Sequence, residues 1–310
     1  MIYASSPHPL ALVAGIKIAK RFKVPCICEV RDLWPETIFA FGKTKEKSIL
    51  GQLLIAGEHW IYKNSDALVF LKEGDTDYLR ERMWLKSSGG DISDDKCYYI
   101  NNGVDIEAFS EQIRSETICD EDLNNAKFKV IYTGAIRPIN NVGNILDAAK
   151  LIEDNDNVQF LIFGEGNQLE ILRKRIVDEG ITNVKLKGYV DKKYIPYVLS
   201  KSSVNILNYS QSKYNWSRGN SSNKLFEYMA SGKPIISTVK MGYSPIDKYD
   251  CGIALEKDTP EALADAVTGI FEMSEERYNE ISGNAKLGAE DFDYKVLTSK
   301  MISLMESQMS

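Results

Sequence analysis

The stretch from Asn220 to Ile236 carries side chains whose types and spacing could bind a nucleoside diphosphate. Its polar start is typical of helix N-caps, and Gly232 is typical of a helix end. A helix N-terminus offers N–H groups and a partial positive charge to a phosphate, and Lys224 would add a full cation. Glu227, three residues on, could accept hydrogen bonds from two neighbouring hydroxyls, as on a ribose. The alternative is an amphipathic helix whose Lys and Glu are simply solvated.

The composition indicates an ordinary soluble enzyme-sized protein. The chain has 310 residues, of which 44% are hydrophobic and 26% charged, enough for two domains. A net charge of −6 argues against general nucleic-acid binding. No apolar run is long enough to span a bilayer and no signal peptide is evident, so we expect a cytoplasmic protein, with peripheral contact at the inner face of the membrane as a possibility. The five cysteines are scattered and only two histidines are present, so we expect no metal and no other cofactor.

Two series of alternating strands and helices are predicted. The second opens at Lys127, with strands expected at 128–133, 158–163, 184–186, 204–207, 235–238 and 253–255. Such alternation predicts a parallel sheet of Rossmann type. The first series has about four strands, where a doubly wound domain usually has about six, and it starts inside a strand. We therefore expect a partial N-terminal domain over 1–118, with 111–125 as the linker, a nucleotide-sugar domain over 119–290, and a C-terminal helix over 291–310 that packs back on the first domain.

Glycine-rich turns follow the first three strands of the second series. Gly134 would allow the backbone to approach a phosphate, and Arg137 could pair with it. Gly164 opens a turn before a helix, which is equally well explained as a structural tight turn. Gly188, Tyr189 and Val190 could hold a flat base between backbone and an aromatic ring.

Taken together, these motifs resemble glycosyltransferase family 4. The resemblance rests on 132–134, 163–166, 187–190, 222–236 and 251–255, which occur in that family's order, and on 29–36 and 102–105 in the first series. The Arg-Asp-Leu-Trp-Pro and Asn-Lys-Leu-Phe-Glu-Tyr forms resemble the WbuB-like branch, which builds O-antigen and capsule. The resemblance implies an α/β GT-B fold, with two Rossmann-like domains facing a cleft and the N-terminal one truncated. It also implies metal-independent, retaining hexosyl transfer from a nucleotide-sugar, expected to be a UDP-sugar.

The resemblance assigns site residues in both domains. Arg137 and Lys224 would neutralise the donor diphosphate and Glu227 would hold the ribose. The full set of donor-binding residues is Gly134, Arg137, Gly164, Gly188, Tyr189, Val190, Ser222, Asn223, Lys224, Leu225 and Glu227. The candidate catalytic residues are His8, Arg31 and Asp32. For Arg31 and Asp32 a structural ion pair is an equal alternative, and a histidine at a helix start, such as His8, is more often structural.

Three departures from the family pattern bear on activity. Gly219 stands where the family commonly has a second glutamate that contacts the transferred sugar, and Arg31 stands where it usually has a histidine. The resemblance also leads us to expect that the family's usual N-terminal portion, with its glycine-rich loop, is missing. We therefore weigh two functions beside transfer to a lipid-linked or saccharide acceptor. One is a non-catalytic, nucleotide-binding half that needs a separate polypeptide for the N-terminal segment. The other, which the transferase motif disfavours, is a GT-B sugar epimerase.

The segment 48–62 has an apolar pattern with two interpretations. Leu50, Leu53, Leu54 and Trp60 could contact a membrane surface. The composition favours the alternative, a helix that covers the sheet.

Overall fold

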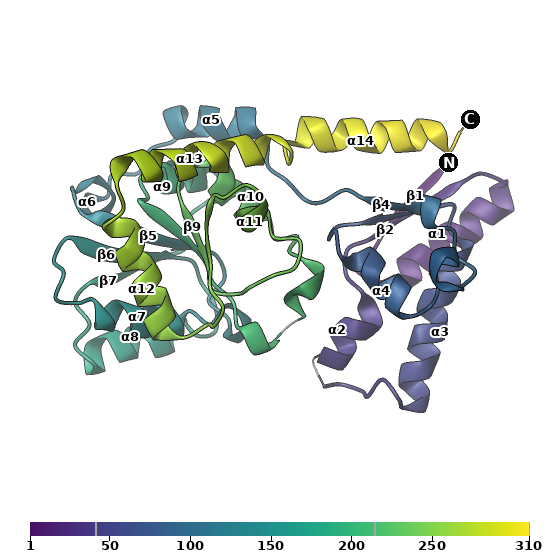
Figure 1. Ribbon diagram of the computed structural model, residues 1–310, viewed down its shortest axis with the longest axis horizontal. Coiled ribbons are helices and arrows are strands. Elements are labelled where there is room, and N and C mark those ends of the chain that lie inside the picture. Colours follow the sequence, from purple (N-terminus) through teal and green to yellow (C-terminus); the bar gives the residue numbers. More distant parts are fainter. Residues whose placement is uncertain (41, 214, 310) are drawn as a thin grey trace. The chain divides into compact units, whose positions relative to one another are not determined.

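The computed structural model describes residues 1–40, 42–213 and 215–309, with the side chain of Lys213 left aside. The chain forms two compact units (Figure 1). The first comprises 1–102, 213–221 and 295–310, and the second comprises 103–212 and 222–294. The divisions thus lie at 102/103 and 294/295, whereas the sequence suggested 118 and 290. Both units are α/β with parallel sheets.

The first unit is built on a four-stranded parallel sheet in the order β1-β2-β3-β4. Its strands are β1 (Ile2–Ser5), β2 (Cys26–Val30), β3 (Ala67–Phe70) and β4 (Cys97–Tyr99). Its helices are α1 (Pro9–Phe22), α2 (Trp34–Ala40), α3 (Ile49–Asn64), α4 (Asp75–Glu81) and, from Lys295 onward, α14 (Tyr294–Ser307).

Both faces of this first sheet are covered. On one face, Cys28, Leu68 and Phe70 pack with side chains of α1 and α3. On the other face, Ile27, Ala67 and Val69 pack against α14 through Leu297 and Leu304. Because successive strand residues point to opposite faces, β2 and β3 must be apolar at nearly every position, as their sequences are.

The second unit is built on a six-stranded parallel sheet in the order β10-β9-β8-β5-β6-β7. Its strands are β5 (Phe128–Thr133), β6 (Val158–Phe163), β7 (Val184–Gly188), β8 (Val204–Leu207), β9 (Ile235–Ser237) and β10 (Gly252–Ala254). Its helices are α5 (Ile106–Ser115), α6 (Glu121–Asn124), α7 (Gly143–Leu151), α8 (Leu169–Asp178), α9 (Ile195–Ser200), α10 (Asn223–Ala230), α11 (Pro245–Lys248), α12 (Pro260–Phe271) and α13 (Glu275–Glu290). The strand order reverses between β5 and β8, the place where ligands bind in open α/β sheets.

The expected linker over 111–125 is wrong, because most of this segment is helical and belongs to the second unit. Asp105 caps α5 by accepting a hydrogen bond from the Ala108 N–H, and Phe109 is buried. Asp120 caps α6 in the same manner, and Leu123 is buried. One buried apolar side chain in each helix is enough to hold these charged segments on the unit, although their composition resembles that of a linker.

The segment 213–221 lies between β8 and α10 in the sequence but is bonded into the first unit. The buried Arg218 guanidinium donates to both carboxylate oxygens of Glu81, at 2.8 and 2.6 Å. The Gly74 N–H donates to the Arg218 carbonyl at 3.1 Å, and the Asn101 side-chain amide donates to the Asn220 carbonyl at 3.0 Å. A bidentate pair supported by backbone bonds fixes both position and direction.

A buried carboxyl group, Glu58 on α3, lies inside the first unit. It accepts hydrogen bonds from the hydroxyls of Tyr62, at 2.7 Å, and Tyr78, at 2.6 Å. Burial raises the pKa of Glu58 to about 7, although the two hydroxyl donors oppose the shift.

This raised pKa predicts that the free energy of unfolding decreases as the pH rises. Between the ordinary carboxyl pKa and about 7, the native state retains a proton that the unfolded chain releases, so the free energy of unfolding decreases as pH rises, by about 3 kcal/mol in all. Glu58→Gln should remove this part of the slope. All four tryptophans lie in the first unit, so urea unfolding followed by tryptophan fluorescence at several pH values reports on this unit.

The matched control is Glu73→Gln, at an exposed carboxylate of the same unit, which should keep the wild-type slope. Burial also raises the pKa of Asp75 to about 7, so a smaller slope of the same sign should remain in Glu58→Gln. An unchanged slope in Glu58→Gln would contradict the prediction.

Candidate functional site

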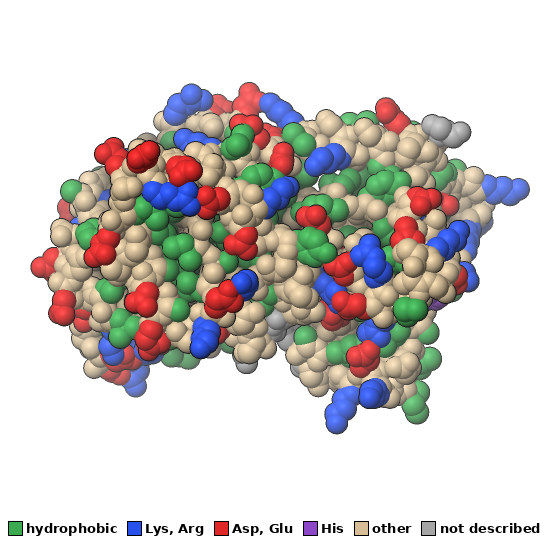
Figure 2. Space-filling view, viewed as in Figure 1, with side chains coloured by type: hydrophobic (Ala, Val, Ile, Leu, Met, Phe, Trp, Pro, Cys, Tyr) green, Lys and Arg blue, Asp and Glu red, His purple; other side chains and the backbone are tan. Residues whose placement is uncertain are grey.

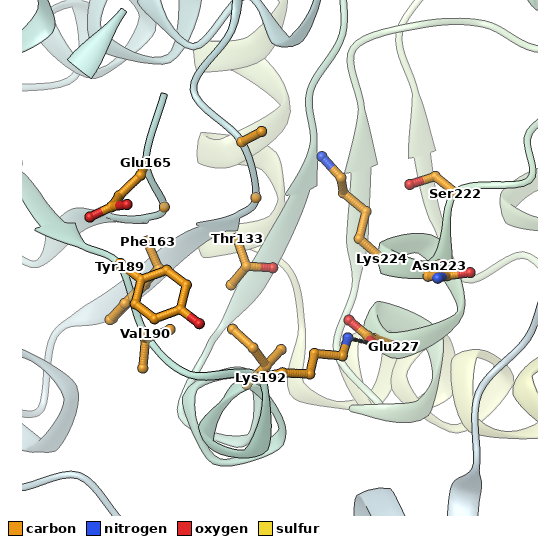
Figure 3. Close-up of a pocket in the computed structure, with 14 residues that line it drawn as sticks. Thr133, Phe163, Glu165, Tyr189, Val190, Lys192, Ser222, Asn223, Lys224 and Glu227 are labelled. Carbon is orange, nitrogen blue, oxygen red and sulfur yellow. Dashed lines mark hydrogen bonds and ion pairs between the residues drawn. The ribbon is translucent and has the colours of Figure 1, made fainter. Parts of the chain in front are cut away.

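A pocket of about 530 Å³ lies in the second unit, at the carboxyl ends of β5, β6 and β7 and the start of α10 (Figure 3). Its lining residues come from four short segments and α9: Thr133, Gly134, Ala135, Phe163, Gly164, Glu165, Tyr189, Val190, Lys192, Ile195, Ser222, Asn223, Lys224 and Glu227. Because parallel strands end at one edge of the sheet, segments far apart in the sequence converge there.

Two glycine turns form the part of the pocket between β5 and β6. Gly134 and Gly164 have φ of +144° and +148°, which disfavour any other residue. A Cβ on Gly164 would lie 1.8 Å from the Gly134 carbonyl oxygen, and one on Gly134 would lie 2.9 Å from the Lys224 Nζ. The turns are also joined by a bond of 2.9 Å from the Gly134 N–H to the Phe163 carbonyl. Only glycine permits this approach, which leaves open space beside the Lys224 ammonium.

Helix α10 is fixed against the end of β5 by its apolar face and one hydroxyl. Leu225, Phe226, Tyr228 and Met229 are fully buried. The Tyr228 hydroxyl accepts a hydrogen bond from the Thr133 N–H at 3.0 Å and donates to the Thr133 carbonyl at 3.2 Å. The opposite side of the same helix therefore presents its polar side chains to the pocket.

Lys224 is a cation held among neutral groups. Its Nζ lies 4.9 Å from the ring centre of Tyr132 and 4.8 Å from that of Tyr209, and among the described residues no carboxylate forms an ion pair with it. Desolvation lowers the pKa of Lys224 to about 8. Aromatic faces stabilise a cation only in part, so an anion at this place would gain a full charge partner.

Glu227 lies one turn further along α10 and forms an ion pair with Lys192, which Figure 3 shows as a dashed line. The Glu227 side chain is 14% exposed and that of Lys192 is 72% exposed. An exposed lysine thus neutralises a nearly buried carboxylate. Exposed lysine pairs contribute little, so a ligand with two hydroxyls could replace Lys192.

Tyr189 and Val190 lie across the pocket from Lys224 and Asn223, with Thr133 between them (Figure 3). Tyr189 is 66% exposed, which leaves its ring open to stacking. The pocket therefore has an aromatic wall, a cationic wall at a helix N-terminus, and a carboxylate near its floor.

Eight of the predicted donor-binding residues line this pocket: Gly134, Gly164, Tyr189, Val190, Ser222, Asn223, Lys224 and Glu227. The other three do not line it. Arg137 is exposed at the start of a 3-10 turn after β5, the Gly188 carbonyl accepts a bond from the Gly164 N–H, and Leu225 is buried in the core.

The candidate catalytic residues lie in the first unit, after β1 and β2. His8 is the N-cap of α1: its Nδ1 accepts a bond from the Leu10 N–H at 3.2 Å, and its ring lies 5.2 Å from that of Trp34. The Arg31 N–H donates to the Ser6 hydroxyl at 2.9 Å. Asp32 lines a separate cavity of this unit. No ion pair joins Arg31 to Asp32 in the part of the chain that the structure describes.

The sequence did not point to Glu165, Lys192 and Ile195 as pocket residues. Glu165 lies inside the predicted glycine turn, so its position could have been noticed. Lys192 and Ile195 follow the Tyr189–Val190 turn, and their approach to Glu227 depends on how that turn folds. Over the described residues, no group of three His, Cys, Asp or Glu side chains could hold a metal ion, and no helix is long and apolar enough to cross a bilayer.

Part of the chain is similar in sequence to known glycosyltransferases. Residues 127–273 match the family model described as glycosyl transferases group 1. TuaH of Bacillus subtilis (strain 168), named as a teichuronic acid biosynthesis glycosyltransferase, is 24% identical over 262 residues, which cover 83% of this chain. The match spans only 62% of TuaH.

Solved structures show the same fold at low identity. Alr3699/HepE from Anabaena, in complex with UDP, superposes with a TM-score of 0.73 at 15% identity, covering 99% of this chain and 79% of that one. A glycosyltransferase from Rickettsia africae ESF-5 superposes with a TM-score of 0.68 at 15% identity, covering 98% and 83%. The chain therefore has the GT-B fold, and its residues 127–273 are similar to the group 1 glycosyltransferases.

Proposed function

We propose that this chain is a retaining glycosyltransferase that moves a hexosyl group from a UDP-sugar to a lipid-linked or saccharide acceptor in surface polysaccharide synthesis. Within the group 1 glycosyltransferases we place it in family 4, in the WbuB-like branch, on the motifs at 29–36 and 222–236. The observation that carries the proposal is the ammonium of Lys224 at the start of α10, which has no carboxylate partner among the described residues and lies one turn from Glu227 in a pocket with an aromatic wall.

Each wall of the pocket matches one part of the donor. The diphosphate would lie between the Gly134 turn and Lys224, where the α10 N-terminus adds its partial charge. The ribose hydroxyls would donate to Glu227 in place of Lys192, and uracil would stack on Tyr189. We propose that Arg137, which is exposed beyond the pocket, reaches the diphosphate when the donor is bound.

The relatives favour this donor and this product class. HepE was solved with UDP and with UDP-glucose, and TuaH is named for teichuronic acid biosynthesis. The pneumococcal transferase GtfA was solved with UDP and GlcNAc. These ligands belong to those proteins, and we extend only the UDP-sugar class to this chain.

In the proposed reaction, the bond between the anomeric carbon and the diphosphate oxygen breaks and UDP leaves. A bond forms between the anomeric carbon and the acceptor hydroxyl oxygen, and the hydroxyl proton passes to the leaving diphosphate oxygen. Negative charge grows on the leaving diphosphate, where Lys224 and the helix N-terminus would stabilise it. Because these groups supply the positive charge, we propose that no metal is needed. His8, Arg31 and Asp32 are proposed to act on the acceptor side, at the cytoplasmic face of the membrane.

The first test is UDP binding by calorimetry, followed by UDP release from UDP-glucose in the presence of a polyprenyl-linked saccharide. Lys224→Ala should weaken UDP binding by about 10- to 100-fold, because a charge-assisted contact is lost from a partly desolvated site. Lys174→Ala, at an exposed lysine of α8, is the control and should bind as wild type. Equal binding by Lys224→Ala would exclude Lys224 from the site. Tight binding without transfer would instead favour the form that needs a separate polypeptide.

A second test uses pH. The lowered pKa of Lys224 means that its ammonium loses a proton as pH rises through about 8, so UDP affinity should fall, by up to about tenfold per pH unit. Lys224→Arg stays charged and should lack this fall, and it also controls for titration of the uracil ring. A wild-type affinity that is constant from about pH 7 to 9 would contradict this assignment.

A third test concerns Glu227. Wild type should bind UDP more tightly than 2′-deoxy-UDP, by about 5- to 20-fold, because one hydroxyl donor to the carboxylate is missing from the analogue. Glu227→Ala should bind the two nucleotides almost equally. Lys192→Ala, which removes only the competing partner, should keep the preference. A preference that survives Glu227→Ala would show that the ribose lies elsewhere.

A further inference from the structure

Helix α3 has an exposed apolar start beside a lysine-rich loop. Ile49 is 84% exposed, Leu50 56% and Leu53 65%, although the far end of the same helix buries Ile61 and Tyr62 in the core. The loop before it carries three exposed lysines, Lys43, Lys45 and Lys47. We refer to these six residues (Lys43, Lys45, Lys47, Ile49, Leu50 and Leu53) as the α3 patch. Figure 2 shows green and blue side chains gathered around this end of α3.

The loop is folded tightly onto the helix, which holds the lysines at the edge of the apolar surface. The Ser48 hydroxyl accepts from the Gly51 N–H at 3.0 Å and donates to the Lys45 carbonyl at 2.7 Å. Gln52 donates to the Glu46 carbonyl at 2.9 Å. A Cβ on Gly51 would lie 2.4 Å from the Lys45 carbonyl oxygen, so glycine is required where the loop crosses the helix.

In the part of the loop that the structure describes, no acidic side chain pairs with the three lysines of the α3 patch. The one acidic side chain within the loop, Glu46, forms an ion pair with Arg82 at 2.6 Å. The chain as a whole has a net charge of −6, whereas the loop beside this exposed apolar surface carries three lysines and one glutamate. This charge would repel cationic partners and attract an anionic one.

The apolar surface continues into a cavity of about 180 Å³ between α1, α2 and α3. Leu53 lines it together with Leu10, which is itself 65% exposed on α1. Further inside, most of the walls are apolar side chains such as Val13, Leu54 and Ile61, and the carboxyl groups of Asp32 and Glu58 also line the cavity. A cavity that opens through exposed leucines can accept part of a hydrocarbon chain.

We propose that the α3 patch docks on an anionic lipid bilayer, with Ile49, Leu50 and Leu53 inserted at the headgroup level and the three lysines on the acidic headgroups. Amphipathic helices with a basic edge bind interfaces through these two contributions together. This site does not depend on the donor site in the second unit. It divides α3 between two roles: the first turns meet the bilayer, and the last turns cover the sheet.

The test is cosedimentation of the full chain with vesicles of phosphatidylcholine, with and without phosphatidylglycerol. We expect binding to the anionic vesicles that weakens with added salt, and little binding to the neutral ones. Two triple variants, Ile49→Ser/Leu50→Ser/Leu53→Ser and Lys43→Glu/Lys45→Glu/Lys47→Glu, should each bind at least about tenfold more weakly.

Each variant has a matched control in the second unit with the same change of composition or charge. These are Leu151→Ser/Ile171→Ser/Leu287→Ser, at exposed apolar positions, and Lys174→Glu/Lys185→Glu/Lys257→Glu, at exposed lysines. Both controls should bind vesicles as wild type. Tryptophan fluorescence and UDP binding verify that the first and second units of every variant remain folded.

Four results would overturn the proposal. They are no binding by wild type, equal binding to neutral vesicles, equal loss in the controls, and a wild-type dimer that the serine variant dissociates. The last would show that a second copy of the chain covers the α3 patch.

Discussion

The site depends on one geometric constraint, the parallel direction of the strands in the second unit. Parallel strands send every strand-to-helix turn to the same edge, so the turns after β5, β6 and β7 and the start of α10 must meet. The hydrogen bonds between Tyr228 and Thr133 then set the height of α10 against β5. With this docking fixed, Lys224 can only point into the space that Gly134 leaves empty. A shift of the helix by one turn would bring Glu227 or Tyr228 to the position of Lys224.

Much of the second sheet could be predicted from the sequence, since β5, β6 and β8 have apolar runs that end at clear turn residues. The pocket was also predictable in outline, because Gly134 and Gly164 each follow a strand and Lys224 and Glu227 lie on one short helix. The predictions that failed concern features that depend on tertiary packing. The 111–125 segment contains too few apolar residues to indicate helices, yet the two helices that overlap it, α5 and α6, each bury one large apolar side chain, Phe109 and Leu123. The ion pair between Glu227 and Lys192 could not be predicted from the sequence, because the two residues are thirty-five positions apart.

Glu58 in the first unit and Lys224 in the second are both ionisable groups that burial removes from water, but their partners differ. Glu58 is satisfied by two tyrosine hydroxyls, so its shifted pKa expresses itself as stability. Lys224 has aromatic neighbours and, among the described residues, no carboxylate partner, and burial lowers its pKa. Desolvation is the same physical cause in both cases, and it shifts both groups toward their neutral forms.

The chain passes between the two units at four places, 102/103, 212/213, 221/222 and 294/295. Neither unit is therefore one continuous piece of polypeptide. During synthesis, Arg218 follows residues 103–212 of the second unit, and the helix that covers one face of the first sheet follows the whole second unit. The first unit therefore cannot be completed before the second unit has been synthesised. A single proteolytic cut at residue 102 would leave the first fragment without its last helix and without its partner for Glu81.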